Sequence, residues 1–363
     1  MKFTIISILF ALVFLSGCRK DNDPIFDDPD KRLIDTLTEY QHTLVSAENG
    51  WKGVIYPTGG GGYFFYLNFT DDNGVTMLSD IDATTAEIPS GATYRLKALQ
   101  LPTLIFDTYS YIHRLSDPDE TKNGGARGLG LESDFEFEYI LTGDTIVLLG
   151  AFHASTMYLV KATAEEAAEI RAGGIKERIE ANENFIKDMP DPYLQFSDNR
   201  KLQFVISGKN VGLTWVEDNG EVKNVSTFFN FTLNGIYLKE VLTYKGNSFK
   251  ELLWDDTKKT YYLLLNGERI EVKNSPTPII PLYFRFGSGK DFNTVAVNID
   301  ELAGLSPEFL SIYNTAKAGL AAVGNNAGRV LDRFDIVFSG EEEMQLKVYY
   351  HNVSNTNYTA TFI

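Results

Sequence analysis

Short segments in which apolar and polar residues alternate constrain the fold of this chain most strongly. From Trp51 to Lys161 the alternation has a period of two, as in a β-strand with one face in a core. Gly59–Gly62, Asp72–Gly74 and Thr142–Asp144 separate some of these segments and favour turns. We therefore expect strands over Trp51–Tyr56, Tyr63–Phe69, Val75–Leu78, Tyr94–Leu99, Thr103–Phe106, Phe135–Leu141, Thr145–Leu149 and Thr156–Lys161.

Two segments in this part of the chain have helical periodicity instead. Apolar residues recur every three or four positions over Leu33–Ala47. A second helix is expected over Thr163–Lys187, where Thr163 and Glu166 fit a capping box. Gly173-Gly174 should weaken or kink this helix by about 1 kcal/mol per glycine.

A second β-rich stretch extends from Tyr193 to about Val272. Within it, Val211–Glu221 is similar to Phe65–Val75 at a constant offset of 146 residues, and each copy follows an expected helix. Two explanations remain open. One is a duplicated helix-plus-β unit, and the other is chance, because hairpins select Asn-Gly turns for their twist whatever their ancestry.

The chain has 363 residues, more than the ~250–300 at which one hydrophobic core usually stops growing. We expect a mainly β (α+β) protein with two helix-plus-antiparallel-β units, for which duplication is one explanation. Its C-terminal part is expected to form a helix over Ser306–Val323 and strands over Arg329–Ser339, Met344–Tyr350 and Tyr358–Ile363. The expected order is signal peptide (1–17), acidic tether (18–30), first unit (31–162), second unit (163–280) and C-terminal strands with a helix (281–363).

The first eighteen residues resemble a bacterial lipoprotein signal. Lys2 precedes the apolar stretch Phe3–Leu15, which is too short to span a ~30 Å bilayer core comfortably. Small Ser16 and Gly17 then precede Cys18, the only cysteine of the chain. The resemblance implies cleavage before Cys18 and lipidation of its thiol and amine, which would tether the protein to the lipid bilayer.

Residues 19–30 contain five aspartates, two prolines and few apolar side chains. This composition predicts a solvated, extended tether. Acidic residues soon after the acylated cysteine also resemble the surface-export signals of lipoproteins in the phylum Bacteroidota. The resemblance implies an outer-membrane protein exposed at the cell surface, whereas a plain linker is the alternative.

Composition and missing motifs exclude several functions. The formal net charge of −16 repels phosphate backbones, so we expect no nucleic-acid partner. The four histidines are far apart, and the sequence contains no His-Glu-x-x-His motif, which disfavours a zinc hydrolase. Gly287–Asp291 imitates the end of a phosphate loop but lacks its first glycine, so the sequence predicts no cofactor.

Asp134, Glu136 and Glu138 alternate with aromatic residues, which puts three carboxylates on one face of the expected strand. They are weak candidates for a Ca²⁺ site. The alternative is a strand whose charged face lies in water. Paired carboxylates could also serve a hydrolase, but among 49 acidic residues the sequence selects no pair, so no catalytic residue is predicted.

Candidate ligand-binding residues follow the expected strand that ends near Phe106. If the alternation continues, Asp107, Tyr109, Tyr111 and His113 share one face. An acid, two phenols and an imidazole could line a ligand groove, with rings that stack and polar tips that bind hydroxyl groups. A cross-strand aromatic ladder is the alternative.

Several segments together resemble the Bacteroidota lipoprotein family catalogued as domain of unknown function 4302. They are Asn49–Trp51, Tyr94–Leu99, Pro102–Tyr109, Ile112–Pro118, Gly130–Phe137 and Phe231–Tyr237. The resemblance implies an outer-membrane surface lipoprotein, often encoded beside TonB-dependent receptors and SusD-like binding lipoproteins. It implies no established activity and no catalytic residues.

Three functional hypotheses follow. The leading one is a non-enzymatic accessory lipoprotein of an outer-membrane nutrient-uptake system that binds a glycan, a peptide or a partner protein. A carboxylate-dependent surface hydrolase is the second, and a structural scaffold of the envelope is the third. An exposed aromatic platform would favour the first, and a deep cleft with paired acids would favour the second.

Overall fold

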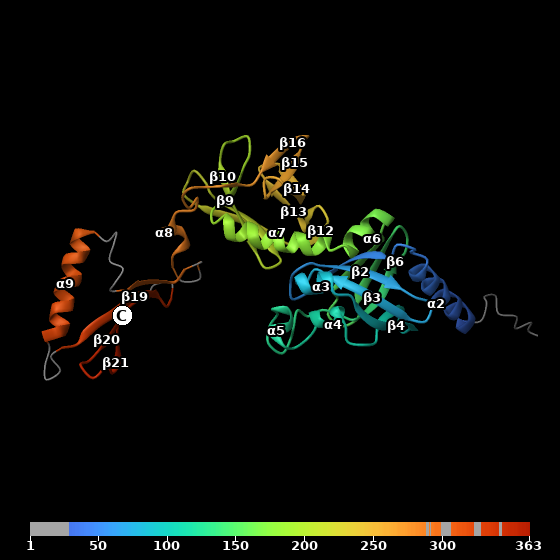
Figure 1. Ribbon diagram of the computed structural model, residues 1–363, viewed down its shortest axis with the longest axis horizontal. Coiled ribbons are helices and arrows are strands. Elements are labelled where there is room, and N and C mark those ends of the chain that lie inside the picture. Colours follow the sequence, from blue (N-terminus) through green and yellow to red (C-terminus); the bar gives the residue numbers. More distant parts are fainter. Residues whose placement is uncertain (1–28, 288–289, 291, 299–305, 323–327, 341–342) are drawn as a thin grey trace, which may run out of the picture. The chain divides into compact units, whose positions relative to one another are not determined.

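The computed structural model describes residues 29–287, 290, 292–298, 306–322, 328–340 and 343–363. The expected signal peptide, Cys18 and the tether as far as residue 28 lie outside the described residues. The chain forms two compact units. Of the described residues, those up to Glu180 belong with Asn230–Leu233 to one unit, and Ala181–Phe229 belongs with those from Asn234 onward to the other (Figure 1).

The first unit contains helix α2 (Pro29–Val45) and a closed antiparallel barrel of eight strands in chain order. Strand β1 pairs with β2 on one side and with β8 on the other, which closes the barrel. The expected helix and all eight expected strands are confirmed. The strands are β1 (Trp51–Tyr56), β2 (Tyr63–Phe69), β3 (Gly74–Ser79), β4 (Ser90–Ala98), β5 (Pro102–Phe106), β6 (Glu136–Leu141), β7 (Thr145–Gly150) and β8 (Thr156–Lys161).

Large apolar side chains fill this barrel. Phe65, Phe106 and Phe137 belong to a single core cluster, and each is at most 1 % exposed. Helix α2 contacts β4 and β2, and the Tyr40 ring stacks on that of the barrel residue Tyr139 with centroids 4.1 Å apart. The alternation of the strands thus buries one face in a shared core, as the period of two requires.

Three short helices interrupt the connections between barrel strands and were not expected from the sequence. Helix α3 (Ala83–Glu87) lies between β3 and β4, whereas α4 (Tyr111–Leu115) and α5 (Glu120–Asn123) lie between β5 and β6. Asp82 caps α3 and pairs with Arg114 of α4 at 2.7 Å. Helices of four or five residues show too little periodicity to be recognised in a sequence.

The expected helix over Thr163–Lys187 is two helices, α6 (Ala164–Arg171) and α7 (Gly174–Asp188). The capping box at Thr163 and Glu166 is confirmed. Gly173 has φ +98°, a backbone conformation that ends a helix and that side-chain-bearing residues rarely adopt. The two glycines therefore break the helix where we expected a weakening or a kink.

Asn230–Leu233 cluster with the first unit. The buried carboxylate of Asp80 accepts hydrogen bonds from the backbone N–H groups of Phe64 and Phe231, both at 2.8 Å. A buried carboxylate needs such donors, so these two bonds fix the segment in the first unit.

The second unit contains a sheet of nine strands in the order β16-β15-β14-β13-β12-β11-β10-β9-β17, with antiparallel neighbours wherever their register is known. Phe185 of α7 packs edge-on against Tyr261 and Trp254, so the helix shares the apolar core of this sheet. The strands are β9 (Pro192–Gln195), β10 (Lys201–Ser207), β11 (Asn210–Val216), β12 (Val222–Thr232), β13 (Gly235–Tyr244), β14 (Asn247–Asp255), β15 (Thr260–Leu265), β16 (Glu268–Glu271) and β17 (Lys273–Asn274).

The two similar segments at an offset of 146 residues occupy different places in the two sheets. Phe65–Val75 spans the hairpin of β2 and β3, whereas Val211–Glu221 covers β11 and the turn that leads to β12. Their turns also differ, because Asn73 has φ +62° in the first and Gly220 has φ +84° in the second. Both units place a helix before antiparallel strands, so duplication and a chance likeness of two Asp-Asn-Gly turns both stay open as explanations.

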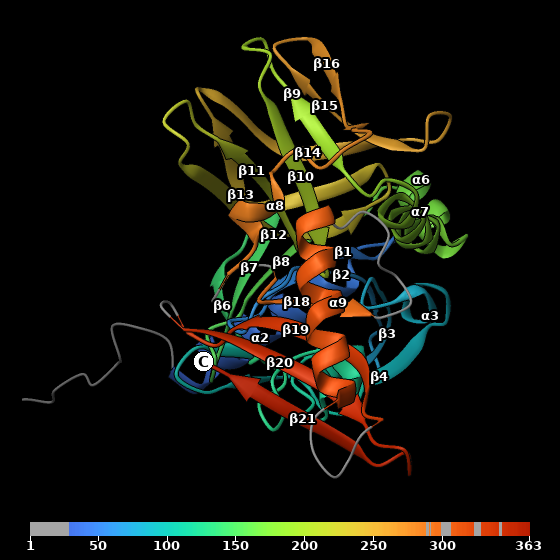
Figure 2. The ribbon, with the colours of Figure 1, turned by 90° about the vertical axis from the view of Figure 1, so that its left-hand side faces the viewer.

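The C-terminal module follows α8 (Leu282–Arg285). It consists of β18 (Thr294–Asn298), α9 (Pro307–Ala322), β19 (Val330–Phe338), β20 (Met344–His351) and β21 (Asn357–Phe362). The strands form an antiparallel sheet in chain order, and α9 packs on β19 (Figure 2). The expected C-terminal helix and three strands are confirmed, and the fold is mainly β with antiparallel sheets, as expected.

Candidate functional site

A groove of about 700 Å³ in the second unit is the candidate functional site. Its floor is formed by β10, β11 and β12. On β11, Val211, Leu213 and Trp215 are buried in the core, so Asn210, Gly212 and Thr214 face the other way. The polar face of these three strands therefore provides the floor of the groove.

The register of the strands arranges the floor in rows. Gln203 pairs with Thr214, and Thr214 pairs with Asn224, which aligns two amides and a hydroxyl across three strands. In the next row, Gly212 lies between Val205 and Ser226. Residues directly opposite each other have Cβ atoms only ~5 Å apart, so each row presents its polar groups to the same small volume.

Gly212 sets the depth of the groove. A Cβ atom at this position would lie 3.0 Å from the Val225 carbonyl oxygen and 3.1 Å from the Ser226 Cβ atom. Both distances are shorter than ordinary van der Waals contacts. The absence of a side chain at Gly212 thus leaves a notch between the polar residues of the neighbouring strands.

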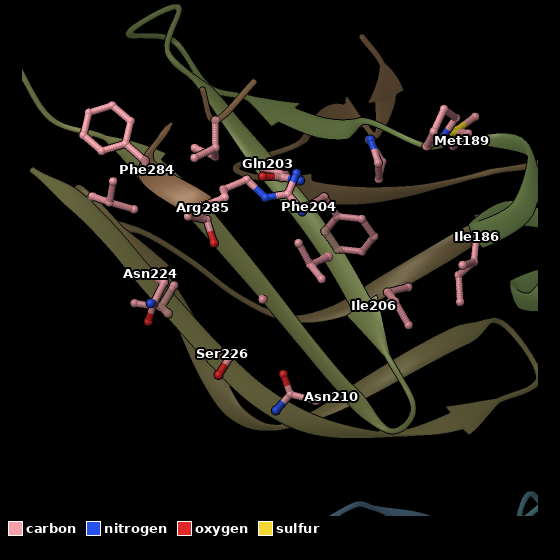
Figure 3. Close-up of a pocket in the computed structure, with 18 of the residues that line it drawn as sticks. Ile186, Met189, Gln203, Phe204, Ile206, Asn210, Asn224, Ser226, Phe284 and Arg285 are labelled. Carbon is pink, nitrogen blue, oxygen red and sulfur yellow. The ribbon is translucent and has the colours of Figure 1, made fainter. Parts of the chain in front are cut away.

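Walls of the groove come from two other parts of the second unit. Ile186 and Met189 border the groove near the end of α7, and Phe284 and Arg285 of α8 border it elsewhere (Figure 3). Asn224, Ser226 and Asn210 follow one another along the floor in the same view. The site therefore combines a polar floor with apolar walls, which is the composition typical of small-molecule pockets.

Gln203 is the polar floor residue that is most deeply buried, at 8 % exposure. The atoms of its side-chain amide are not among the fully buried polar atoms that lack a hydrogen-bond partner in the described part of the chain. An amide that lines the groove can donate to and accept from a ligand that enters it. Arg285 and Lys290 add positive charge to the lining.

The four ligand-binding residues expected from the sequence do not share a strand face, because β5 ends at Phe106. Asp107 and Tyr109 lie in the following loop, and Tyr111 and His113 belong to α4. The expectation of continued alternation was wrong, since Ser110 starts a helix, in which the period is no longer two.

The structure still brings two of these four residues together. The His113 ring lies 5.9 Å from the Tyr109 ring and 4.7 Å from the Phe135 ring, in a stacked arrangement with each. Burial lowers the pKa of His113 below its ordinary value of 6.5. The Tyr109 hydroxyl donates to Asp117 and thereby lowers the pKa of that carboxyl.

The other two residues point to separate partners. Asp107 pairs with Arg95 at 2.8 Å, and the Tyr111 hydroxyl donates to the Ile88 carbonyl oxygen at 2.8 Å. All four side chains thus have structural partners within the first unit.

The three carboxylates considered for Ca²⁺ also do not lie together on a solvent-exposed strand face. Asp134 lies before β6 and is 2 % exposed, whereas Glu136 and Glu138 are half-buried on the strand. Asp134 already accepts hydrogen bonds from Phe152, His153 and Ser155. Among the described residues, no group of three or more His, Cys, Asp or Glu side chains is arranged to hold a metal ion.

A family model matches residues 22–256, and this range includes the groove strands β10, β11 and β12. The chain belongs to the family described as domain of unknown function 4302 (DUF4302). The DUF4302 region contains the first barrel and β9–β14, and hence the floor of the groove. It ends before α8 and the C-terminal module.

Other comparisons add no function to the DUF4302 match. No curated protein matches the chain. A protein of unknown function of the DUF3598 family from Nostoc punctiforme is 8 % identical, with 88 % of this chain and 96 % of that chain covered and a TM-score of 0.18. The DNA polymerase III subunit beta of Pseudomonas aeruginosa is 9 % identical, with 92 % and 82 % covered and a TM-score of 0.12.

No helix in the described part of this DUF4302 protein combines the length and apolar character needed to span a membrane. The groove itself was not expected from the sequence. The alternation of Asn210, Gly212 and Thr214 with apolar residues was the available signal for a polar strand face. It could not reveal that α7 and α8 would wall that face.

Proposed function

We propose that this protein is a non-enzymatic lipoprotein that binds a glycan for an outer-membrane nutrient-uptake system. Lipidation at Cys18 would anchor it in the outer membrane of a member of the Bacteroidota, with its folded part at the cell surface. The signal-like order of Lys2, Phe3–Leu15 and Cys18, the acidic tether and the DUF4302 match support this location.

The observation that carries the proposal is the polar floor of the groove, in which Gln203 is the most deeply buried polar residue. Amide side chains both donate and accept hydrogen bonds, as do the hydroxyl groups of sugars. Thr214, Asn224 and Ser226 supply further groups of the same kind. The Phe284 ring provides an apolar surface for a sugar ring.

The same geometry favours a glycan over an extended peptide. Peptides commonly bind by adding a strand to a free sheet edge, where backbone groups are unpaired. Strand β11, at the centre of the floor, is paired with β10 on one side and with β12 on the other over Asn210–Thr214, so the backbone groups there are occupied. Recognition at the centre of the floor therefore comes from side chains, and a ligand with many hydroxyl groups suits them best. A peptide held through its side chains is the second candidate ligand.

The lining residues also favour binding over hydrolysis. None of the described residues that line the groove is an aspartate, glutamate, histidine or cysteine. General acid–base and nucleophilic catalysis depend mainly on these residue types. A carboxylate-dependent hydrolase remains the alternative elsewhere in the protein, and release of reducing ends from a polysaccharide pool would support it.

The proposed uptake system supplies the protein partners. The family resemblance implies a TonB-dependent receptor and a SusD-like lipoprotein, and a scaffold role would involve the same proteins without a glycan. Co-purification from detergent-solubilised membranes tests these partners. Recovery of a receptor together with glycan binding supports an accessory role, whereas recovery without any glycan binding supports the scaffold.

Thermal stability in the presence of neutral and acidic oligosaccharides and short peptides tests the binding function. The protein without residues 1–18 suits this experiment, because every described element begins at or after Pro29. A ligand at 100 times its dissociation constant adds about 2.7 kcal/mol to the free energy of unfolding. We expect an oligosaccharide, and no peptide, to raise the melting temperature by several degrees.

Two substitutions locate the site. Asn224→Leu removes an amide from the groove floor and should abolish the stabilisation by the oligosaccharide. Asn247→Leu makes the same change at the start of β14, outside the groove, and should leave it intact. Equal stabilisation of both variants would place binding elsewhere and contradict the proposed site.

A further inference from the structure

The sheet of the C-terminal module has one apolar face. The register places Phe334 opposite Val348 and Ile336 opposite Leu346. On the next strand, Ala360 lies opposite Val348. Alternate residues of three neighbouring strands thus form a continuous apolar surface, as the period of two dictates.

Helix α9 covers only part of this surface. Tyr313 is 5 % exposed and belongs to a small core with Leu331 and Phe334. Other apolar residues of the same face stay open to solvent, with exposures of 54 % for Met344 and 58 % for Phe362. Monomeric proteins rarely leave a continuous apolar surface of this kind without a binding role.

A groove of about 750 Å³ lies between the helix and the sheet. Ala316 of α9 and Ala360 of β21 are the smallest residues that line it, and they leave the space that longer side chains would fill. The volume is within the range of about 300–1,000 Å³ that is typical of small-molecule sites. The groove therefore has the size of a ligand site and an almost wholly apolar lining.

The two ends of the groove differ chemically. Leu320 at the end of α9, Leu331 at the start of β19 and Arg329 line one end, because β19 follows α9 closely in the chain. The Arg329 guanidinium lies over the Tyr350 ring, 5.4 Å from its centroid, which holds the charge at this end. Met344 and Phe362, at the far ends of β20 and β21, line the opposite end.

Charge then selects the ligand. Arg329 is the only charged residue among the described side chains that line the groove, although the whole chain has a net charge of −16. We propose that this groove binds a long-chain fatty acid, with the hydrocarbon tail between α9 and the sheet and the carboxylate at Arg329. Each buried CH₂ group favours binding, and the ion pair fixes the direction of the chain. This site is separate from the glycan groove and does not depend on the proposed glycan function.

Fluorescence of cis-parinaric acid, displaced by oleate or by methyl oleate, tests the proposal on the protein without residues 1–18. The two competitors have the same tail, but only oleate has a charge. We expect oleate to compete about tenfold better than methyl oleate, which is the effect of one charge-assisted hydrogen bond. Arg329→Gln should remove this preference, whereas Lys317→Gln, on α9 but outside the groove, should retain it.

Filling the groove tests the location of the tail. Ala316→Phe should abolish parinarate binding, and Ala318→Phe, an exposed position on the same helix outside the lining, should not. Ala360→Leu fills the groove from the sheet side and provides a second variant if Ala316→Phe fails to fold. Parinarate binding that survives Ala316→Phe or Ala360→Leu would overturn the proposal, as would its absence in the unmodified chain. An amphipathic helical peptide that displaces parinarate more strongly than oleate would also overturn it, in favour of helix docking.

Discussion

The carboxylate of Asp134 accepts two hydrogen bonds from Ser155, one from the backbone N–H at 3.1 Å and one from the hydroxyl group at 2.7 Å. Its other oxygen accepts from the backbone N–H groups of Phe152 and His153 at 2.8 and 2.9 Å. A single buried side chain therefore holds the connection between β7 and β8. The residue that the sequence suggested as a metal ligand has a structural environment instead.

Asp134→Asn should lower the free energy of unfolding by roughly 2–3 kcal/mol, because an amide cannot accept from all of these donors. Urea denaturation measures the change. Glu138→Gln, on the neighbouring strand, is the matched control and should change the stability by less than about 0.5 kcal/mol. Stabilisation of the unmodified chain by Ca²⁺ that Asp134→Asn abolishes would contradict the structural role.

The pKa of His113, lowered by burial, predicts a pH effect on stability. The unfolded chain, with the ordinary pKa of 6.5, binds the proton more readily than the folded chain does. The stability is therefore full above pH 6.5 and is lost as the pH falls through the folded pKa. His113→Phe keeps an aromatic ring beside Phe135 but cannot titrate.

We expect the unmodified protein to lose stability relative to His113→Phe as the pH falls below 6.5, and the two to change in parallel above it. Urea denaturation at a series of pH values measures the difference. His113→Leu, which also cannot titrate, separates the effect of the ring from that of the charge. A constant difference across the whole series would rule out the pH effect.

Tyr261 and Asn182 form a buried hydrogen bond between α7 and the second sheet, and its loss should lower the free energy of unfolding. The Tyr261 hydroxyl donates to the Asn182 side chain at 2.9 Å, and both residues are at most 6 % exposed. Tyr261→Phe keeps the ring in its cluster with Phe185 and Trp254 but leaves the amide of Asn182 without this donor. We expect Tyr261→Phe to lower the free energy of unfolding, measured by urea denaturation, by about 1–3 kcal/mol.

Tyr262→Phe is a matched control for this pair, because Tyr262 follows on the same strand and is only half-buried. Its effect should stay within about 0.5 kcal/mol. A similar decrease in the free energy of unfolding of both variants would mean that the hydrogen bond of the Tyr261 hydroxyl group does not stabilise the fold.

The sequence predicted the strands well because their signal is local. The alternation in Trp51–Tyr56 and Tyr63–Phe69 gave both strands with their observed bounds, and Thr163 with Glu166 gave the start of a helix. Each of these signals depends on neighbours a few residues apart, where backbone geometry and capping act. The closure of β1 against β8 joins segments about a hundred residues apart, and no local pattern encodes it.

The candidate site was predicted poorly for the same reason. Asp107, Tyr109, Tyr111 and His113 were assigned to one face by extending a strand past Phe106, where the chain in fact turns into a short helix. The groove depends on distant partners, since Phe284 and Arg285 lie more than fifty residues after Asn224 and Ser226. The sequence pattern marked the polar strand face, but only the structure gives its walls.

Hydrogen exchange of the backbone amides tests whether a glycan binds on β10, β11 and β12. The protein without residues 1–18 would be compared alone and with a mixture of neutral oligosaccharides. Glycan binding at the groove predicts slower exchange in three segments, near Gln203 on β10, Gly212 on β11 and Asn224 on β12, and no such change in Asn224→Leu. Slower exchange confined to other segments, or equal in both proteins, would contradict a glycan site on these strands.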